Sequence, residues 1–145
     1  MNGSYEIPPN VDWRLKRPSK SMWLWILLAF SAVTAVEGIL KISGGPLISL
    51  SRQQLVDCDD LNYGCEYGNI STAFKYIIKN KGLVEGEEYP YESVKGTCRS
   101  SGFKSHSPIS DYHRVVPSES YLQQAVAKQL VSGSGFHFRI NYFLR

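Results

Sequence analysis

A long apolar run near the start of the chain restricts its possible folds more than any other feature. Ser21–Lys41 reads SMWLWILLAFSAVTAVEGILK, and Met22–Val33 within it forms a stretch of about 12 mostly apolar residues. A helix that crosses a membrane needs roughly 20 such residues, whereas about 10–14 are typical of a buried core helix or a signal peptide. Basic residues before the run and small residues after it resemble a secretory signal, although 21 residues precede it. The run therefore predicts a buried helix, with a signal or anchor as the open alternative.

The size and charge of the chain exclude several classes of protein. With 145 residues, the chain is long enough for one domain with a core and too short for two of typical size. Its hydrophobic content of 43%, charged content of 20% and net charge of +3 are ordinary for a soluble globular protein. The lysines and arginines form no run, so the composition indicates a solvated surface and no binding to nucleic acid.

Local patterns predict one extended segment, four helices and a long coil. The double proline in Ile7–Lys16 excludes a helix start there. Apolar residues at helical spacing predict a helix over Ala29–Ile42, ended by the Gly-Gly-Pro that follows shortly after it. Ser51, as an N-cap with Gln54 as its capping-box partner, opens a second helix. The remaining predictions are a helix over Ser71–Asn80 with Phe74, Ile77 and Ile78 inward, turn-rich coil over Leu83–Asp111, and a helix over Tyr121–Leu130.

Six segments of the chain occur in the order seen in one protein family. They read LAFSAVTAVEGILK, LISLSRQQLVDCD, YGCEYG, AFKYIIKNKGL, EEYPYESVKGTC and YLQQAVAKQ. In this order they resemble the papain-like cysteine proteases, particularly the plant type, and PPNVDWR resembles the start of the mature enzyme. The resemblance covers Ile7–Lys16 and Ala29–Ser132.

This resemblance implies an α+β fold of two lobes, one mainly helical and one a β-barrel, with the active site between them. It implies cysteine-type peptide hydrolysis: a cysteine thiolate at the N-terminus of the central helix attacks the carbonyl, a histidine acts as base, and an asparagine orients the histidine. A glutamine and a backbone N–H stabilise the oxyanion. The residues after KQLVS have little resemblance to the family, so we expect the helical lobe to be present and the barrel lobe to be largely missing.

The nucleophile position is occupied by a hydrocarbon side chain. The family signature C-G-[SA]-C-[WY] sits immediately before AFSA, which is intact here. The cysteine position is therefore Leu27, and the following tryptophan position is Leu28. Counting back places Ser21 loosely at the oxyanion glutamine, because about four residues are missing between Lys16 and Leu27. Leucine has no nucleophile, so we expect a chain without peptidase activity.

The histidine and asparagine of the family's site have no match either. They are expected roughly 130–150 residues after the cysteine, and the sequence ends 118 residues after Leu27. None of the histidines sits in a matching motif, and their spacing to Cys58 and Cys65 fits no known metal site. We therefore interpret them as surface residues and expect no metal and no cofactor; they are His106, His113 and His137.

The genetic code offers an origin for the apolar block. Codons for Met22–Leu28, read one base later, permit Cys-Gly-Ser-Gly-Ser-Cys-Trp, which is close to the family signature. Either the gene copy has decayed or the deduced sequence contains an error or a wrong splice, and the sequence leaves both open.

The resemblance also implies substrate-binding residues and a cysteine pairing. GCEYG occupies the family's Gly-Cys-x-Gly-Gly loop, whose backbone pairs with extended substrate; Tyr67 replaces a glycine there and Gly68 is retained. The family's pairing implies a Cys58–Cys98 disulfide. Cys65 would be a free thiol, because Leu24 holds its partner's place.

Two tripeptides match the N-glycosylation sequon, Asn2-Gly3-Ser4 and Asn69-Ile70-Ser71, although chance matches to three residues are common. The resemblance implies a secreted, vacuolar or lysosomal protein, but we expect no signal or pro-segment ahead of Ile7, so the localisation stays open.

The expected organisation has four parts. Residues 1–16 form the mature-type N-terminal segment, 17–28 the anomalous block, 29–132 the helical lobe with the start of the second, and 133–145 a divergent tail. The predicted function is that of an inactive homologue of the family's endopeptidases, which act on peptides or proteins. A non-catalytic fragment that docks on an inhibitor or a homologue, or a pseudogene product, is the alternative.

Overall fold

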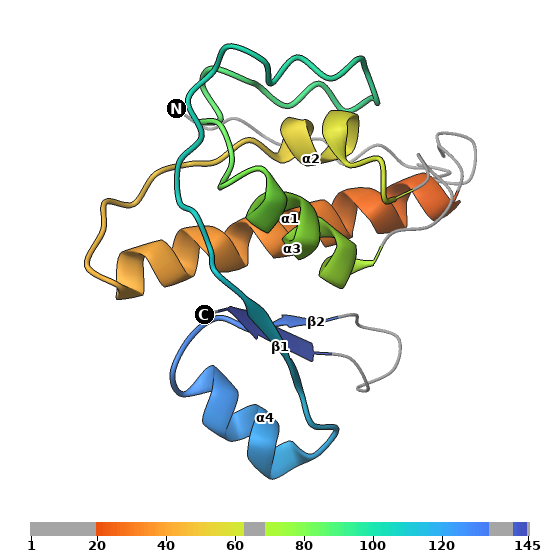
Figure 1. Cartoon of the computed structure of the whole chain (residues 1–145). Helices are drawn as coiled ribbons and strands as arrows, with labels where there is room; N and C mark the ends of the chain where they lie inside the picture. Colours follow the sequence, from red (N-terminus) through yellow and green to blue (C-terminus); the bar gives the residue numbers. More distant parts are fainter. Residues whose placement is uncertain (1–19, 63–68, 134–140, 145) are drawn as a thin grey trace, which may run out of the picture.

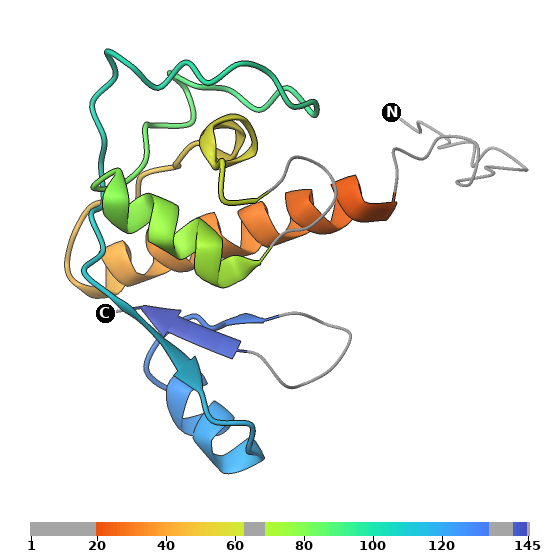
Figure 2. The ribbon, with the colours of Figure 1, turned by 45° about the vertical axis from the view of Figure 1, so that its right-hand side comes forward.

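The computed structural model describes residues 20–62, 69–133 and 141–144, with the side chains of 20–26 and 141–143 excepted. The expected extended segment Ile7–Lys16 lies outside these residues. The elements in chain order are α1 (Lys20–Ile42), α2 (Arg52–Cys58), α3 (Ile70–Lys79), β1 (Tyr112–Val115), α4 (Glu119–Val126), β2 (Ser132–Gly133) and β3 (Asn141–Leu144). Helix α1 crosses the molecule between α2 and the sheet, and α4 lies beyond the sheet (Figures 1 and 2).

Helix α1 is one helix of 23 residues that includes both the apolar run Met22–Val33 and the helix expected over Ala29–Ile42, and it begins nine residues before Ala29. Its first nine residues contain leucine, methionine, isoleucine and tryptophan but neither glycine nor proline, so nothing in them interrupts a helix that the following residues nucleate. The chain leaves the helix at Gly44, whose φ of +85° suits glycine. Leu28, Ala32 and Val33 are buried, as expected for a core helix. Among the described residues, no helix is both long and apolar enough to cross a membrane.

The cap of α2 is half of the expected capping box. Ser51 Oγ accepts a hydrogen bond from the Gln54 N–H at 3.0 Å, as predicted. The Gln54 side chain does not return to Ser51. Its Oε1 accepts from the Val84 N–H at 2.7 Å, and the Ser51 N–H donates to the Val84 carbonyl instead. A tertiary contact has therefore replaced the reciprocal local bond.

Helix α3 confirms the third predicted helix, with Phe74 and Ile77 fully buried and Ile78 only partly buried. The coil that follows is anchored by two isolated bridges, Leu50 to Glu85 and Leu83 to His106. Gly82, between α3 and the second bridge, has a φ of +114°. A Cβ atom on Gly82 would lie 1.9 Å from the His106 carbonyl oxygen. Only glycine fits this approach.

The sheet is antiparallel and has the strand order β1-β3-β2. Helix α4 begins two residues before the expected Tyr121 and ends at Val126, short of Leu130, and none of its residues is buried. Helices α1 and α4 contact the small sheet, and α2 and α3 pack on α1, so the described residues have the mixed content of the expected α+β class. The described residues hold this short three-stranded sheet rather than a closed barrel.

The core lies where α1 meets α2, α3 and the sheet. The Ser132 hydroxyl, buried in β2, donates to the Ser31 carbonyl of α1 at 3.0 Å. The contiguous apolar core draws on these elements and on the coil between them, and its buried side chains are Leu28, Ala29, Ala32, Val33, Ala35, Val36, Leu50, Leu55, Val56, Ile70, Ala73, Phe74, Ile77, Leu83, Ile109 and Leu144.

Replacement of Gly82 by alanine should destabilise the protein strongly. The added Cβ meets backbone, which cannot turn away, so we expect a loss of about 3 kcal/mol or more in the free energy of unfolding. Gly102→Ala is the matched control, because Gly102 has a φ of +94° with open space around the added atom. That variant should lose only about 1–2 kcal/mol. Urea denaturation measures both, and equal losses would contradict the close approach at Gly82.

Candidate active site

Leu27 lies on the exposed side of α1, at the position that the sequence assigns to the nucleophile. Its side chain is 63% exposed, whereas Leu28, at the tryptophan position, is buried in the core. Leu27 is the eighth residue of α1 and thus falls in its third turn. The positive partial charge of a helix is confined to its first turn, where N–H groups are unsatisfied. The structure therefore gives this position neither a nucleophilic atom nor a helix N-terminus.

Ser21, the expected oxyanion position, falls in the first turn of α1, and its side chain is outside the described residues. Tyr67 and Gly68, the expected substrate-binding residues, and Cys65, the expected free thiol, also lie outside them. These assignments stay predictions.

A polar cluster fixes the exposed side of α1 to the start of α2. Glu37 Oε1 accepts from the Leu50 N–H at 2.8 Å, and its Oε2 lies 3.3 Å from an Arg52 nitrogen. The Arg52 guanidinium lies over the Phe30 ring, 5.3 Å from its centroid. The Tyr91 ring contacts Phe30 edge to face at 5.1 Å between centroids. Leu27 and Phe30, three residues apart on α1, therefore share a face with Tyr91 beside it.

A buried network that the sequence analysis missed holds the coil after α3 against α2. Asp57, on α2, accepts from Tyr89 Oη at 2.7 Å, from Gln53 Nε2 at 2.8 Å and from the Gly96 N–H at 2.7 Å. Burial raises the pKa of the Tyr89 phenol, and the bond to Asp57 raises it further, so Tyr89 is a neutral donor. Three donors from two segments converge on the Asp57 carboxyl group, which therefore has a structural role.

Asn62 joins the two ends of the segment that contains residues 63–68. Its Oδ1 accepts from the Asn69 N–H at 2.9 Å and from Thr72 Oγ1 at 2.7 Å. Its Nδ2 donates to Asp59, whose pKa is raised by burial and lowered in part by this bond. These contacts hold the end of α2 beside the start of α3.

The described histidines do not form a site with Leu27. His106 pairs with Glu85 at 3.5 Å, and His113 lies 3.7 Å from Asp111. His137 is outside the described residues. No group of three or more potential metal ligands occurs among the residues that the structure describes.

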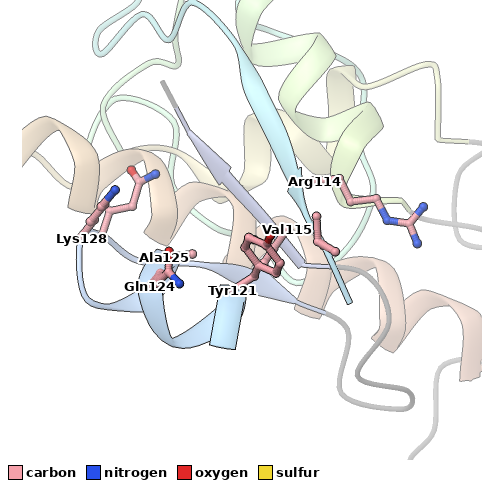
Figure 3. A pocket seen from close by; sticks show the side chains of 8 residues that line it. Arg114, Val115, Tyr121, Gln124, Ala125 and Lys128 are labelled. Carbon is pink, nitrogen blue, oxygen red and sulfur yellow. The ribbon is translucent and has the colours of Figure 1, made fainter. Parts of the chain in front are cut away.

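A pocket of about 240 Å³ lies between α4 and β1. Figure 3 shows Lys128 and Arg114 toward opposite ends of it, with Tyr121 and Val115 between them. Its lining contains no cysteine, serine, histidine or carboxylate, and none of the predicted site residues. It therefore lacks the thiol and the histidine that the family's mechanism needs.

The expected disulfide between Cys58 and Cys98 is present and confirms that pairing. It joins the last residue of α2 to the coil that carries Tyr89 and Gly96. The bridge and the Asp57 network therefore hold the same two segments together.

Comparisons with known proteins match the chain over most of its length. The family model described as "Papain family cysteine protease" matches residues 7–135. Zingipain-1 of Zingiber officinale is 47% identical over 137 residues, which are 87% of this chain and 59% of that protein. The solved structure of bromelain from Ananas comosus with the E-64 inhibitor has a TM-score of 0.68 and 40% identity, and the match covers 85% of this chain and 59% of that one. The solved structure of the Carica candamarcensis cysteine protease with E-64 has a TM-score of 0.67 and 39% identity, and the match covers 85% of this chain and 60% of that one. The chain thus spans about three fifths of each.

Peptide mapping without reductant, after thiol alkylation, should find Cys58 and Cys98 in one linked pair and the label on Cys65. Closing a loop with a sequence separation of 40 residues removes about 4 kcal/mol of unfolded-state freedom in the chain-entropy model, so reduction should lower the melting temperature markedly. A Cys58–Cys65 link, or label spread evenly over the three cysteines, would contradict the pairing.

Proposed function

Because the chain belongs to the papain family of cysteine proteases, we propose that it is a homologue of the family's endopeptidases that does not itself cleave peptide bonds. One observation carries this proposal: Leu27, at the nucleophile position, is an exposed hydrocarbon in the third turn of a continuous helix. Covalent catalysis needs a thiolate, and a leucine side chain has no atom that attacks a carbonyl.

The continuous helix removes more from the nucleophile position than the thiol of one side chain. In the family, the helix N-terminus lowers the pKa of the nucleophilic thiol. It also supplies unpaired N–H groups near the oxyanion. In the third turn, backbone N–H groups are bonded to carbonyls one turn earlier. Restoring the thiol at Leu27 would therefore restore neither effect.

The assigned positions fit the same proposal. Residues 29–132 would carry the family's helical lobe and the start of the second lobe, with the barrel lobe largely missing, and 17–28 the altered block. Ser21 would stand loosely at the oxyanion position, where the family has the side-chain amide of a glutamine and this chain has a hydroxyl. Tyr67 would place a large side chain where the family has a glycine beside the substrate, with Gly68 retained.

Binding of a peptide or inhibitor without cleavage is the second candidate function. Leu27 and Tyr91 are exposed, and Tyr91 contacts Phe30, which lies one turn from Leu27 on α1. These side chains form a small apolar surface at the assigned site, with the Arg52 guanidinium over the Phe30 ring. The related proteases from Ananas comosus and Carica candamarcensis hold the E-64 inhibitor. A surface of this kind favours contact with apolar side chains of a peptide.

Activity assays on purified protein test the proposal. The natural chain should show no hydrolysis of fluorogenic peptides above the buffer rate. Turnover that a thiol-directed epoxide abolishes would overturn the proposal.

A pair of variants tests the helix argument separately. Cys65→Ser and Cys65→Ser/Leu27→Cys differ by one thiol, so the difference in alkylation rate between them belongs to position 27. The double variant should remain inactive, and its added thiol should titrate within about one unit of the ordinary pKa of about 8.5. Hydrolysis by the double variant, or a thiol pKa below about 7, would show that position 27 still has an activating environment.

A further inference from the structure

The tripeptide Asn69-Ile70-Ser71 stands at the start of α3, and the structure shows its side chains in detail. Asn69 is the N-cap of the helix and is exposed to solvent. The second match, at Asn2, lies outside the described residues.

The two sides of the Asn69 amide have different roles. Its Oδ1 accepts from the Ser71 N–H at 2.9 Å and from the Ser71 hydroxyl at 3.0 Å. Its Nδ2 makes no hydrogen bond to any residue that the structure describes. Oδ1 caps the helix, and Nδ2 has no part in the cap of this exposed residue.

Attachment of a sugar to Nδ2 would therefore leave the fold unchanged. The modified side chain is still an amide, so Oδ1 would keep both bonds from Ser71. The sequon requires a hydroxyl two residues after the asparagine, and here that hydroxyl lies against the same amide group. The local geometry of α3 thus accommodates the modification without loss of its cap.

The disulfide provides an independent observation on the compartment. Cys58 and Cys98 are joined, and disulfides form and persist in oxidising compartments such as the lumen of the endoplasmic reticulum. N-linked oligosaccharides mark proteins that pass through this secretory route. A chain that acquires this disulfide there would also meet the transferring enzyme.

We propose that Asn69 is an N-glycosylation site. The donor is an oligosaccharide linked through pyrophosphate to a lipid. Asn69 Nδ2 forms a bond to the anomeric carbon of the first sugar, the bond from that carbon to the pyrophosphate oxygen breaks, and the amide gives up one proton to a base of the transferring enzyme. The lipid pyrophosphate is the leaving group, and nothing is oxidised or reduced.

Translation of the full chain behind an added signal sequence, in the presence of endoplasmic reticulum microsomes, tests the proposal directly. Release of the glycan by an amidase in heavy-oxygen water marks the former acceptor as labelled aspartate in peptide mass maps. The expected result is label at position 69. An unlabelled Asn69 in translocated chains, including chains labelled only at Asn2, would overturn it.

Three variants separate the sequon from the helix cap. Ser71→Thr keeps the hydroxyl and should keep the glycan, whereas Ser71→Ala should lose it. Asn69→Asp removes the acceptor nitrogen but keeps a capping oxygen, so it should lose the glycan while the melting temperature stays close to that of the unglycosylated natural chain. A glycan that persists at position 69 in Ser71→Ala would contradict the assignment of the hydroxyl.

Discussion

The buried face of α1 supports most of the structure. Small side chains at Ala29 and Ala32 let neighbouring elements approach closely, while Val33 and Val36 fill the space between them. Helices α2 and α3 pack on this helix from one side and the strands of the sheet from the other. Helix α1 thus contacts both the other helices and the sheet. Its start and its length therefore determine which of its residues are exposed to solvent.

That constraint links the fold to the proposed loss of activity. The block ahead of Ala29 contains good helix formers and no helix breaker, so the helix extends through it to Lys20. The extension moves the helix N-terminus away from Leu27 by about two turns. The chemistry expected of the family at this position depends on that terminus, so under the proposal the change in local sequence would remove the electrostatic support as well as the thiol.

The sequence predicted the family, the α+β class, the disulfide and the core of α3, because each rests on local periodicity or on motifs that stand intact. The sequence did not predict side-chain hydrogen bonds whose partners are distant in the chain. Gln54 follows a capping pattern, yet its side chain bonds the Val84 N–H, 30 residues away. Asp57 is an unremarkable acid in sequence, and only folding brings the Tyr89 phenol to it across 32 residues. The apolar run from Met22 and the periodic pattern from Ala29 each predicted a helix, but not that the two form one helix from Lys20; a helix continues until a residue interrupts it, and none does so between them.

Backbone chemical shifts from NMR of the isotope-labelled chain test the central claim most directly, since they report helix residue by residue. The account predicts helical shifts without a break from residue 20 to residue 42, with slow amide exchange from the second turn onward. Coil-like shifts over residues 20–28, with helix beginning only at Ala29, would contradict it, because Leu27 would then stand just ahead of a helix N-terminus as the family's nucleophile does.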